Sequence, residues 1–335
     1  MHKNLLVDPF GRVHDYLRIS VTDHCNLRCV YCMPEEGMKF DPDHRLMTYE
    51  EITEIVQVLA PLGIKKLRIT GGEPLVRKGL DRLIEYLSAI PGIEDIALST
   101  NGIYLAQFAD RLKASGLTRV NISLDSLVPE KFAMITRGGD VRKVLEGLQA
   151  SYQVGFLPIK LNVVLMKGVN DNEVAQFLRM SHEQPIHIRF IEYMPIGNDG
   201  VSWKTGYVPL SHVLDTCTEL GWAYERHEDI YGSGPATTYQ LEGAAGTFGL
   251  IRPISDHFCG SCNRLRLTAD GHIKACLYWQ DEYNVRQHIG DTAAIESLFR
   301  SALARKPQTH EMAKALSGEA QSGVPTIRRM SQIGG

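Results

Sequence analysis

The chain has 335 residues, a length that suits either a barrel or two closely packed parts. Its 36 Lys and Arg residues are balanced by 39 Asp and Glu residues, so the molecule has no overall basic field for non-specific binding of nucleic acid. The sequence shows no secretion signal and no apolar stretch long enough to span a membrane, so we expect a cytoplasmic protein that binds neither nucleic acid nor membrane.

The first two thirds of the chain alternate short β-branched runs with amphipathic stretches that have helical spacing. This alternation is typical of βα units on a parallel sheet. Strands are expected at 16–21, 66–70, 96–99, 119–124, 160–165 and 187–193. Six such units predict an α/β fold with an open, partial (β/α)6 barrel that resembles a TIM barrel.

Three cysteines follow the first expected strand. Cys25, Cys29 and Cys32 have the spacing Cys-x3-Cys-x2-Cys and are called the first triad below. Three thiolates at this spacing can bind three irons of a four-iron cluster and leave the fourth iron open for a small molecule. A zinc site with a fourth ligand such as His24 and a disulfide with a spare thiol are the alternatives. Seven cysteines in a chain without an export signal favour metal binding over disulfides.

The first long helix is expected at 49–62. Thr48 and Glu51 can form a capping box at its start, and Gly63 suits its end. The second expected strand then leads into the turn Gly71-Gly72-Glu73-Pro74, in which two residues without a Cβ allow a close approach of the backbone.

Unusual residues recur where the expected strands end. Besides the first triad and the Gly-Gly-Glu-Pro turn, these are Thr100, Ser123, Asp125 and Met194. The loops after parallel barrel strands share one face, where active sites are built. We therefore expect the active site at this face.

The alternation stops after about residue 209. A Gly-rich, β-leaning stretch at 231–252 leads to Cys259, Cys262 and Cys276, which are called the second triad below. We expect a core at 9–225 and a C-terminal region at 226–335 that closes the open barrel. Taken alone, the second triad also suits a zinc ribbon with His257 or His272 as the fourth ligand.

The segment around the first triad resembles the radical S-adenosylmethionine (SAM) enzymes, because Tyr31 lies between the last two cysteines and the Gly-Gly-Glu-Pro turn follows. Two incomplete triads, with Arg264-Leu265-Arg266 after Cys262, are similar in particular to the GTP 3′,8-cyclases of molybdenum cofactor biosynthesis. The resemblance extends from Leu17 to Gly335. It implies that a 5′-deoxyadenosyl radical removes the C3′ hydrogen of GTP, and that C3′ attacks C8 to give (8S)-3′,8-cyclo-7,8-dihydroguanosine 5′-triphosphate.

The same resemblance implies the cofactors and their ligands. The first triad holds a [4Fe-4S] cluster that binds SAM, and the second triad holds a [4Fe-4S] cluster that faces GTP. The implied SAM contacts are Tyr31, Gly72, Ser123 and Met194. The implied GTP contacts are Arg18, Arg68, Thr100, Lys160, Arg264, Leu265 and Arg266, with Lys66 and Arg189 as further phosphate partners.

Strand alternation bears on these cations independently of the resemblance. Lys66 and Arg68 share one side of their strand, and Arg264 and Arg266 share one side of theirs. Charges inside otherwise apolar strands need partners, and Arg suits two-point contact with phosphate. Exposed surface charge is the alternative. The sequence lacks a Walker-type phosphate loop, which argues against an ordinary P-loop GTPase.

The last eight residues, 328–335, are called the C-terminal tail below. Gly334 and Gly335 can enter a channel too narrow for side chains, although a frayed end is the ordinary expectation for a terminus. The resemblance implies that the tail reaches the active site. Arg328 or Arg329 is then expected to act in catalysis beside Arg264 and Arg266.

Two other functions remain open from the sequence alone: another radical SAM maturase with an auxiliary cluster, or a non-catalytic zinc-binding module. If the resemblance holds, the partners are an electron donor of unknown identity and the next enzyme of molybdopterin synthesis, and the chain forms a homodimer.

Overall fold

The computed structural model of the chain describes residues 5–197, 202–228 and 234–334. A twelve-stranded sheet has the order β12-β11-β10-β1-β2-β3-β4-β5-β6-β9-β8-β7. The six expected strands are present within one residue at each end and are parallel neighbours, which confirms the α/β partial barrel. They are β1 (Tyr16–Ser20), β2 (Lys66–Thr70), β3 (Asp95–Thr100), β4 (Arg119–Ser123), β5 (Ile159–Leu165) and β6 (Ile186–Glu192).

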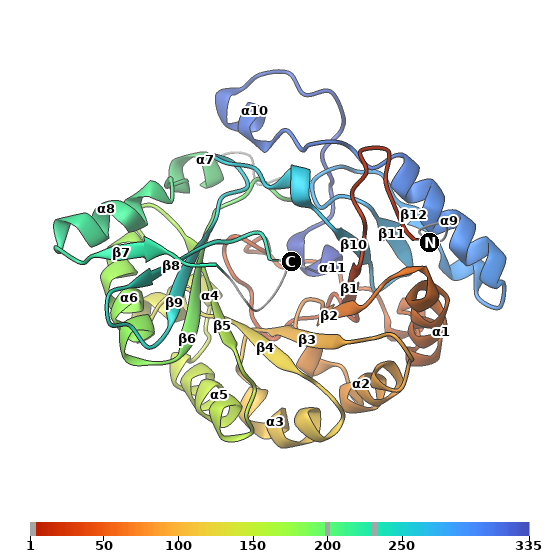
Figure 1. Cartoon of the computed structure of the whole chain (residues 1–335), viewed down its shortest axis with the longest axis horizontal. Coiled ribbons are helices and arrows are strands. Elements are labelled where there is room, and N and C mark those ends of the chain that lie inside the picture. Colours follow the sequence, from red (N-terminus) through yellow and green to blue (C-terminus); the bar gives the residue numbers. More distant parts are fainter. Residues whose placement is uncertain (1–4, 198–201, 229–233, 335) are drawn as a thin grey trace.

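Helices cover the outer side of the curved sheet (Figure 1). The α-helices between the first six strands are α1 (Tyr49–Leu59), α2 (Leu80–Ser88), α3 (Leu105–Ala114), α4 (Pro129–Thr136), α5 (Val141–Gln153) and α6 (Val174–Glu183). Two more, α7 (Ser202–Gly206) and α8 (Ser211–Glu219), follow β6. Short 3-10 helices lie at Asp43–Arg45, Ala60–Leu62, Pro74–Val76, Asp171–Glu173, Cys259–Ser261 and Arg286–His288.

The predicted capping box of α1 is confirmed. Thr48 accepts a hydrogen bond from the backbone N–H of Glu51, and the Glu51 carboxylate accepts one from the backbone N–H of Thr48. The chain leaves the following 3-10 turn at Gly63, whose φ of 100° favours glycine. Local sequence signals therefore fix both ends of this helical segment.

Strand alternation divides each barrel strand between two surroundings. On β1, Leu17 and Ile19 are fully buried in the core between sheet and helices, whereas Tyr16 and Arg18 lie on the opposite, concave side. This concave side is called the lumen below. Polar strand residues thus collect in the lumen, where the site is built.

The C-terminal region extends the barrel at both edges. β9 pairs in parallel with β6, and β10 pairs in parallel with β1. Because the sheet ends at β7 and β12, no strand pair in the described part of the chain closes it. The remaining elements are β7 (Tyr224–Arg226), β8 (Thr237–Leu241), β9 (Thr247–Ile251), β10 (Arg264–Leu267), β11 (His272–Lys274), β12 (Tyr283–Asn284), α9 (Thr292–Ala304), α10 (Met312–Ser317) and α11 (Met330–Ile333).

The predicted division into 9–225 and 226–335 stays a prediction, since strands from both parts share one sheet. The short helix α11 lies near the centre of the open barrel (Figure 1). In the described ranges, no helix is both long and apolar enough to cross a membrane.

Candidate active site

Three arginines lie side by side across the lumen. The strand register aligns Arg266 of β10, Arg18 of β1 and Arg68 of β2 at one level. Tyr16 lies one level lower, between Arg264 and Lys66. As predicted, the two cations of β2 lie on one side of that strand, and so do the two of β10. Cations from three adjacent strands are thereby brought together.

The proximity of these guanidinium groups has an electrostatic cost. Burial and the charge of Arg266 hold the pKa of Arg18 well below its usual range, and burial with the charge of Arg264 lowers the pKa of Arg266 to about 10. Arg68 donates hydrogen bonds to the Tyr16 hydroxyl and, at 3.3 Å, to the Ser99 hydroxyl. A bound polyanion would offset this repulsion, because charge-assisted contacts to phosphate pair the buried cations.

Two further predicted cations face the lumen from the other side. The register places Lys160 beside Asn121 and His187, and Arg189 beside Asn162. Lys160 and Arg189 are buried. Arg189 Nη2 donates to Asn121 Oδ1 at 3.1 Å. Burial and these two cations keep the pKa of His187 well below its usual range, so this side of the lumen is also positively charged.

The structure places the Thr100 side chain away from the lumen. Its side chain lies on the side of β3 opposite to Ser99, and its hydroxyl donates to Glu73 Oε1 at 2.7 Å. Ser99 instead faces the lumen, where Arg68 contacts it. Leu265 is also turned away from the lumen, because its side chain is fully buried in the core behind the sheet.

The first triad lies on a loop after the carboxyl end of β1. The backbone N–H of Val30 donates to the carbonyl of Ile135 at 2.9 Å, and that of Cys32 donates to the carbonyl of Cys29 at 2.9 Å. Burial raises the pKa of Cys25 to about 12 and that of Cys32 to about 11. Such thiols become ligands only when a metal displaces their protons, so this loop suits metal binding and not a reactive free thiolate.

The Gly-Gly-Glu-Pro turn supports this loop. Gly72 N–H donates to the Thr22 carbonyl at 2.8 Å, and a Cβ on Gly72 would overlap the His24 carbonyl. Glu73 is buried and accepts hydrogen bonds from Thr100 and from the backbone N–H of Asn101. The two glycines thus lie too close to the backbone before Cys25 to carry a side chain. Through Glu73, the turn joins that backbone to the end of β3.

The other predicted SAM contacts lie near the first triad or between the triads. The Tyr31 hydroxyl donates to Asp125 Oδ2 at 2.6 Å, and Asp125 Oδ1 accepts from the Val164 backbone N–H at 2.8 Å. The register turns Ser123 toward the lumen beside Asn162. Met194 lines the cavity of the second triad, described next.

The second triad lines a cavity of about 80 Å³ together with Arg264, Arg266 and Lys306. The Cys262 N–H donates to the Cys259 carbonyl at 3.1 Å. Burial raises the pKa of Cys262, but the positive charges of Arg264 and Lys306 outweigh it and lower that pKa to about 7. The cavity therefore favours a thiolate and an anionic occupant.

The two triads lie at opposite ends of one strand pair. The first triad follows the carboxyl end of β1, whereas Cys262 precedes the amino end of β10, which runs parallel to β1. Cys276 follows β11, which is antiparallel to β10 and so returns to the end where Cys262 lies. Arg18 and Arg266 lie on these strands between the two triads.

The thiol donors suit two four-iron clusters, because each triad offers three thiolates and leaves one iron open. All seven cysteines are free thiols, and Cys217 is buried on α8 as a small apolar residue. Within residues 5–197, 202–228 and 234–334, no three His, Cys, Asp or Glu side chains converge as around a single ion. Of the histidines predicted as a fourth zinc ligand, His24 contacts the Asp41 carbonyl, His272 contacts Asp270, and His257 packs against the ring of His310.

The described part of the C-terminal tail enters the lumen. Arg266 Nη1 donates to the carbonyls of Gly334 at 2.6 Å and Ile333 at 3.2 Å. Gly334 has φ 68°, and a Cβ there would overlap the Thr70 side chain. The prediction for Gly335 concerns a residue outside the described ranges.

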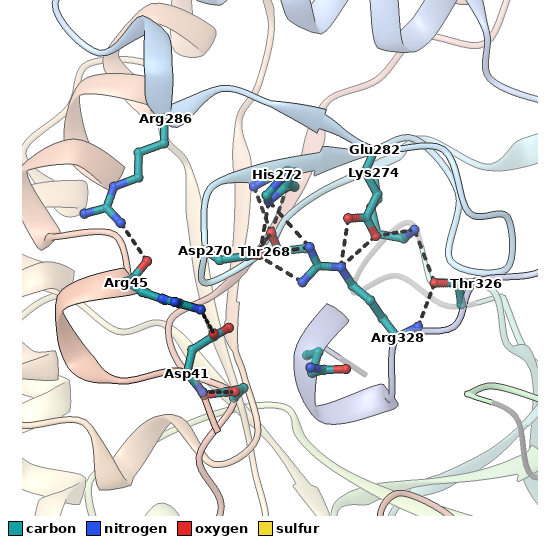
Figure 2. A network of polar contacts seen from close by, with 12 residues as sticks. Asp41, Arg45, Thr268, Asp270, His272, Lys274, Glu282, Arg286, Thr326 and Arg328 are labelled. Atoms are coloured by element: carbon teal, nitrogen blue, oxygen red, sulfur yellow. Dashed lines mark hydrogen bonds and ion pairs between the residues drawn. The ribbon is translucent and has the colours of Figure 1, made fainter. Parts of the chain in front are cut away.

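The tail arginines take different places. Figure 2 shows Arg328 between two carboxylates: its Nε lies 2.7 Å from Glu282 Oε1, and its Nη2 lies 2.9 Å from Asp270 Oδ2. These ion pairs fasten the start of the tail to the strand loops beyond β10 and occupy the guanidinium of Arg328. The charge of Arg329, in contrast, contributes to lowering the pKa of Cys32, although burial raises that pKa overall.

Comparison with known proteins decides the family. The Radical SAM superfamily matches residues 19–181, and Molybdenum Cofactor Synthesis C matches residues 186–312. The GTP 3′,8-cyclase of Listeria monocytogenes serovar 1/2a is 56% identical over 99% of both chains, and that of Lactiplantibacillus plantarum is 48% identical over 98% of this chain and 99% of its own. The chain belongs to the GTP 3′,8-cyclase family.

Solved structures agree with this family in fold. The crystal structure of Streptococcus suis SuiB bound to S-adenosylmethionine superposes with a TM-score of 0.57, at 14% identity, over 87% of this chain and 68% of that one. The likeness supports the radical SAM barrel architecture. A different maturase and a zinc module are not favoured, because full-length GTP 3′,8-cyclase relatives match the whole chain.

Three residues were missed by sequence reasoning. Ser99 could have been found by extending the alternation of β3 from Ala97, its lumen neighbour on the same side. Asp125 was noted at a strand end without a role, and only the fold brings it to Tyr31. Lys306 carries no motif, and it reaches the second triad through the packing that follows α9.

Proposed function

We propose that this chain converts GTP to (8S)-3′,8-cyclo-7,8-dihydroguanosine 5′-triphosphate with the lumen residues described above. The observation that carries the proposal is the row of Arg266, Arg18 and Arg68 between the two cysteine triads. A triphosphate bound to this row would lie within reach of radical chemistry at one end and of the second cluster at the other. This arrangement supports GTP, as the family membership does.

We assign the first triad to the [4Fe-4S] cluster that binds SAM and the second triad to the substrate-facing [4Fe-4S] cluster. When bound and reduced, the first cluster supplies the electron that cleaves SAM and generates the 5′-deoxyadenosyl radical. Tyr31, Gly72, Ser123 and Met194 are the proposed SAM contacts. Asp125 orients the Tyr31 ring through its hydrogen bond.

The lumen cations hold the substrate. Arg18, Arg68 and Arg266 bind phosphate oxygens, and Lys160, Arg189, Arg264 and Lys66 complete the positive lining. Lys66 Nζ lies 3.3 Å from Asp15 at the less buried rim, so its contribution is the weakest. The hydrogen atom from C3′ ends in 5′-deoxyadenosine, the C3′–C8 bond forms, and one electron and one proton complete the product.

The decisive experiment is anaerobic incubation of the reconstituted protein with SAM, GTP and dithionite, followed by mass-spectrometric identification of the products. We expect 5′-deoxyadenosine and the cyclised nucleotide to appear together. Cleavage of SAM with unchanged GTP would instead indicate another radical SAM maturase, and a colourless protein that contains zinc would indicate a binding module.

We also propose the partners that the reaction requires. An external electron donor must reduce the first cluster, and the cyclised nucleotide must be taken up by the next enzyme of molybdopterin synthesis, because it is an intermediate. A homodimer and a cytoplasmic location remain predictions. The latter agrees with seven free cysteines, which suit a reducing compartment.

Replacing Arg18 by Gln is expected to weaken GTP binding without loss of either cluster. Loss of one charge-assisted phosphate contact costs about 1.5–3 kcal/mol, or roughly one to two orders of magnitude in affinity. Isothermal titration calorimetry with GTP measures the change, and iron analysis checks the clusters. Arg142→Gln, on the exposed face of α5, is the control and should bind as the parent does. Equal GTP affinity in Arg18→Gln and the control would return Arg18 to a structural role.

The two sides of β3 predict different phenotypes for two neighbouring residues. Ser99→Ala should raise the KM for GTP with little change in thermal stability, because its hydroxyl faces the substrate side of Arg68. Thr100→Val should lower the thermal midpoint, since it removes the donor to buried Glu73 at a cost of about 1 kcal/mol or more. Steady-state kinetics and thermal unfolding of both variants distinguish the two. The reverse pattern would restore Thr100 as the GTP contact.

A further inference from the structure

Lys306 is a buried cation beside the second triad that the reaction described above does not use. It follows α9, and the whole residue is only 5% exposed. Nζ donates to the Ala275 carbonyl at 2.6 Å and to the Arg264 carbonyl at 2.8 Å. These carbonyls belong to the residue before Cys276 and to the second residue after Cys262. One ammonium group therefore joins the two chain segments that carry these cysteines.

The charge of Lys306 has no carboxylate partner. Over residues 5–197, 202–228 and 234–334, no Asp or Glu lies within ion-pair distance of its Nζ. Lys274 is also buried, but its charge is paired with a carboxylate, because its Nζ lies 3.0 Å from Glu282 Oε1 (Figure 2). Buried ammonium groups are costly unless they are paired. An anion must therefore come from elsewhere to offset the charge of Lys306.

The charged groups that line the same cavity as Lys306 identify that anion. Burial lowers the pKa of Lys306, and the charges of Arg12 and Arg264 act in the same direction. The carboxylate of Asp8 is already paired with Arg12, whose Nε lies 2.5 Å from it, and Arg12 also donates to the Cys259 carbonyl at 2.7 Å. The groups that favour the charged lysine are Cys262 and Cys276. Among the described residues, the second triad, as thiolates of a cluster, is therefore the anion that faces Lys306 in this cavity.

The first triad has the opposite surroundings. Burial is the main factor that disfavours all three thiolates; Glu73 adds to it at Cys25 and Asp125 at Cys29 and Cys32, and among the neighbouring charges Arg329 acts in the opposite sense, at Cys32. Net charge and hydrogen bonds to the sulfurs are among the main determinants of the reduction potential of an iron–sulfur cluster. A positive group near a cluster stabilises its reduced, more negative form and raises the potential.

We propose that Lys306 is the charge partner of the second cluster and raises its reduction potential relative to a site without this ammonium group. The proposal rests on the assignment of the second triad to a cluster. Lys306 acts through Cys262 and through the carbonyls of Ala275 and Arg264, so it is a positioning and tuning residue. Its charge keeps the substrate-facing cluster easier to reduce and the surrounding cavity attractive to anions.

The test uses the full chain with Cys25, Cys29 and Cys32 replaced by Ala, so that only the second cluster can be reconstituted. Anaerobic redox titration followed by electron paramagnetic resonance measures its midpoint potential. We expect Lys306→Met to shift the midpoint to a more negative value, and Lys306→Arg to stay near the parent. Arg305→Met, which removes an exposed charge one residue away, is the control and should leave the midpoint unchanged.

Lys306→Gln provides a second neutral variant if Lys306→Met assembles no cluster, since an amide can still donate to the two carbonyls. A midpoint unchanged in the neutral variant that assembles would overturn the proposal. So would an equal shift in the complementary chain whose second triad is replaced and which holds only the first cluster. A first-triad variant with no cluster signal at all would instead overturn the second-cluster assignment, and the proposal with it.

Discussion

Cys25→Ala is expected to abolish SAM cleavage and to halve the bound iron. The parent chain should bind about eight irons as two cubane clusters, and a variant without one ligand of the first triad should keep about four. The expectation follows from the position of Cys25 on the loop after β1, where the backbone of His24 supports the Gly-Gly-Glu-Pro turn. Iron and sulfide analysis with an assay for 5′-deoxyadenosine measures both effects.

Cys276→Ala is the matched control for this experiment. It removes a ligand at the opposite end of the same strand pair, so it should also lose about four irons and yet retain some SAM cleavage. GTP cyclisation should be lost, because the substrate-facing cluster is absent. A full iron content in Cys25→Ala would refute the ligand assignment, and GTP cyclisation at the parent rate in Cys276→Ala would refute the role of the second cluster.

The barrel strands could be predicted from the sequence because each has a local signature. Short β-branched runs predicted the six strands within one residue, and strand alternation placed Lys66 with Arg68 and Arg264 with Arg266. The capping box of Thr48 and Glu51 was equally local. These features depend on neighbours within a few residues, so they can be predicted from short segments of the sequence.

Ser99 and Thr100 show how a shift of one residue reverses the direction of a side chain. Ser99 and Thr100 both end β3 and both carry a hydroxyl, so residue type does not distinguish them. They differ in the side of the strand on which they lie. The Ser99 hydroxyl contacts Arg68 in the lumen, and the Thr100 hydroxyl contacts Glu73 behind the sheet. Reading the alternation of β3 backwards from its apolar residues would have favoured Ser99.

Other contacts could not be predicted because they join distant parts of the chain. Arg328 meets Asp270 and Glu282 across 58 and 46 residues, and Lys306 meets the carbonyl before Cys276 across 31. No local pattern marks such pairs. The prediction that Arg328 or Arg329 acts in catalysis came from their place in the tail and stays a prediction. The ion pairs of Arg328 hold the start of the tail, whereas the charge of Arg329 acts on Cys32 of the first triad.

Gly334→Ala is expected to suppress the GTP-derived product while preserving iron content and SAM cleavage. Gly334 has φ 68°, which L side chains rarely adopt, and its added Cβ would overlap Thr70. The tail must then move away from Arg266, whose guanidinium binds the Gly334 and Ile333 carbonyls. Removing Gly334 and Gly335, or appending one bulky residue, should have the same effect. Product formation per SAM cleaved is the measurement.

Gly318→Ala separates backbone strain from crowding. Gly318 ends α10 with φ 80°, but a Cβ there would meet no heavy atom within 4 Å. This variant therefore carries a similar backbone strain, of about 1 kcal/mol, at a place remote from Arg266. It should form product at the parent rate. If Gly334→Ala and the truncated chain also form product at that rate, the contact of Arg266 with the tail has no part in the reaction, and the tail is an ordinary chain end.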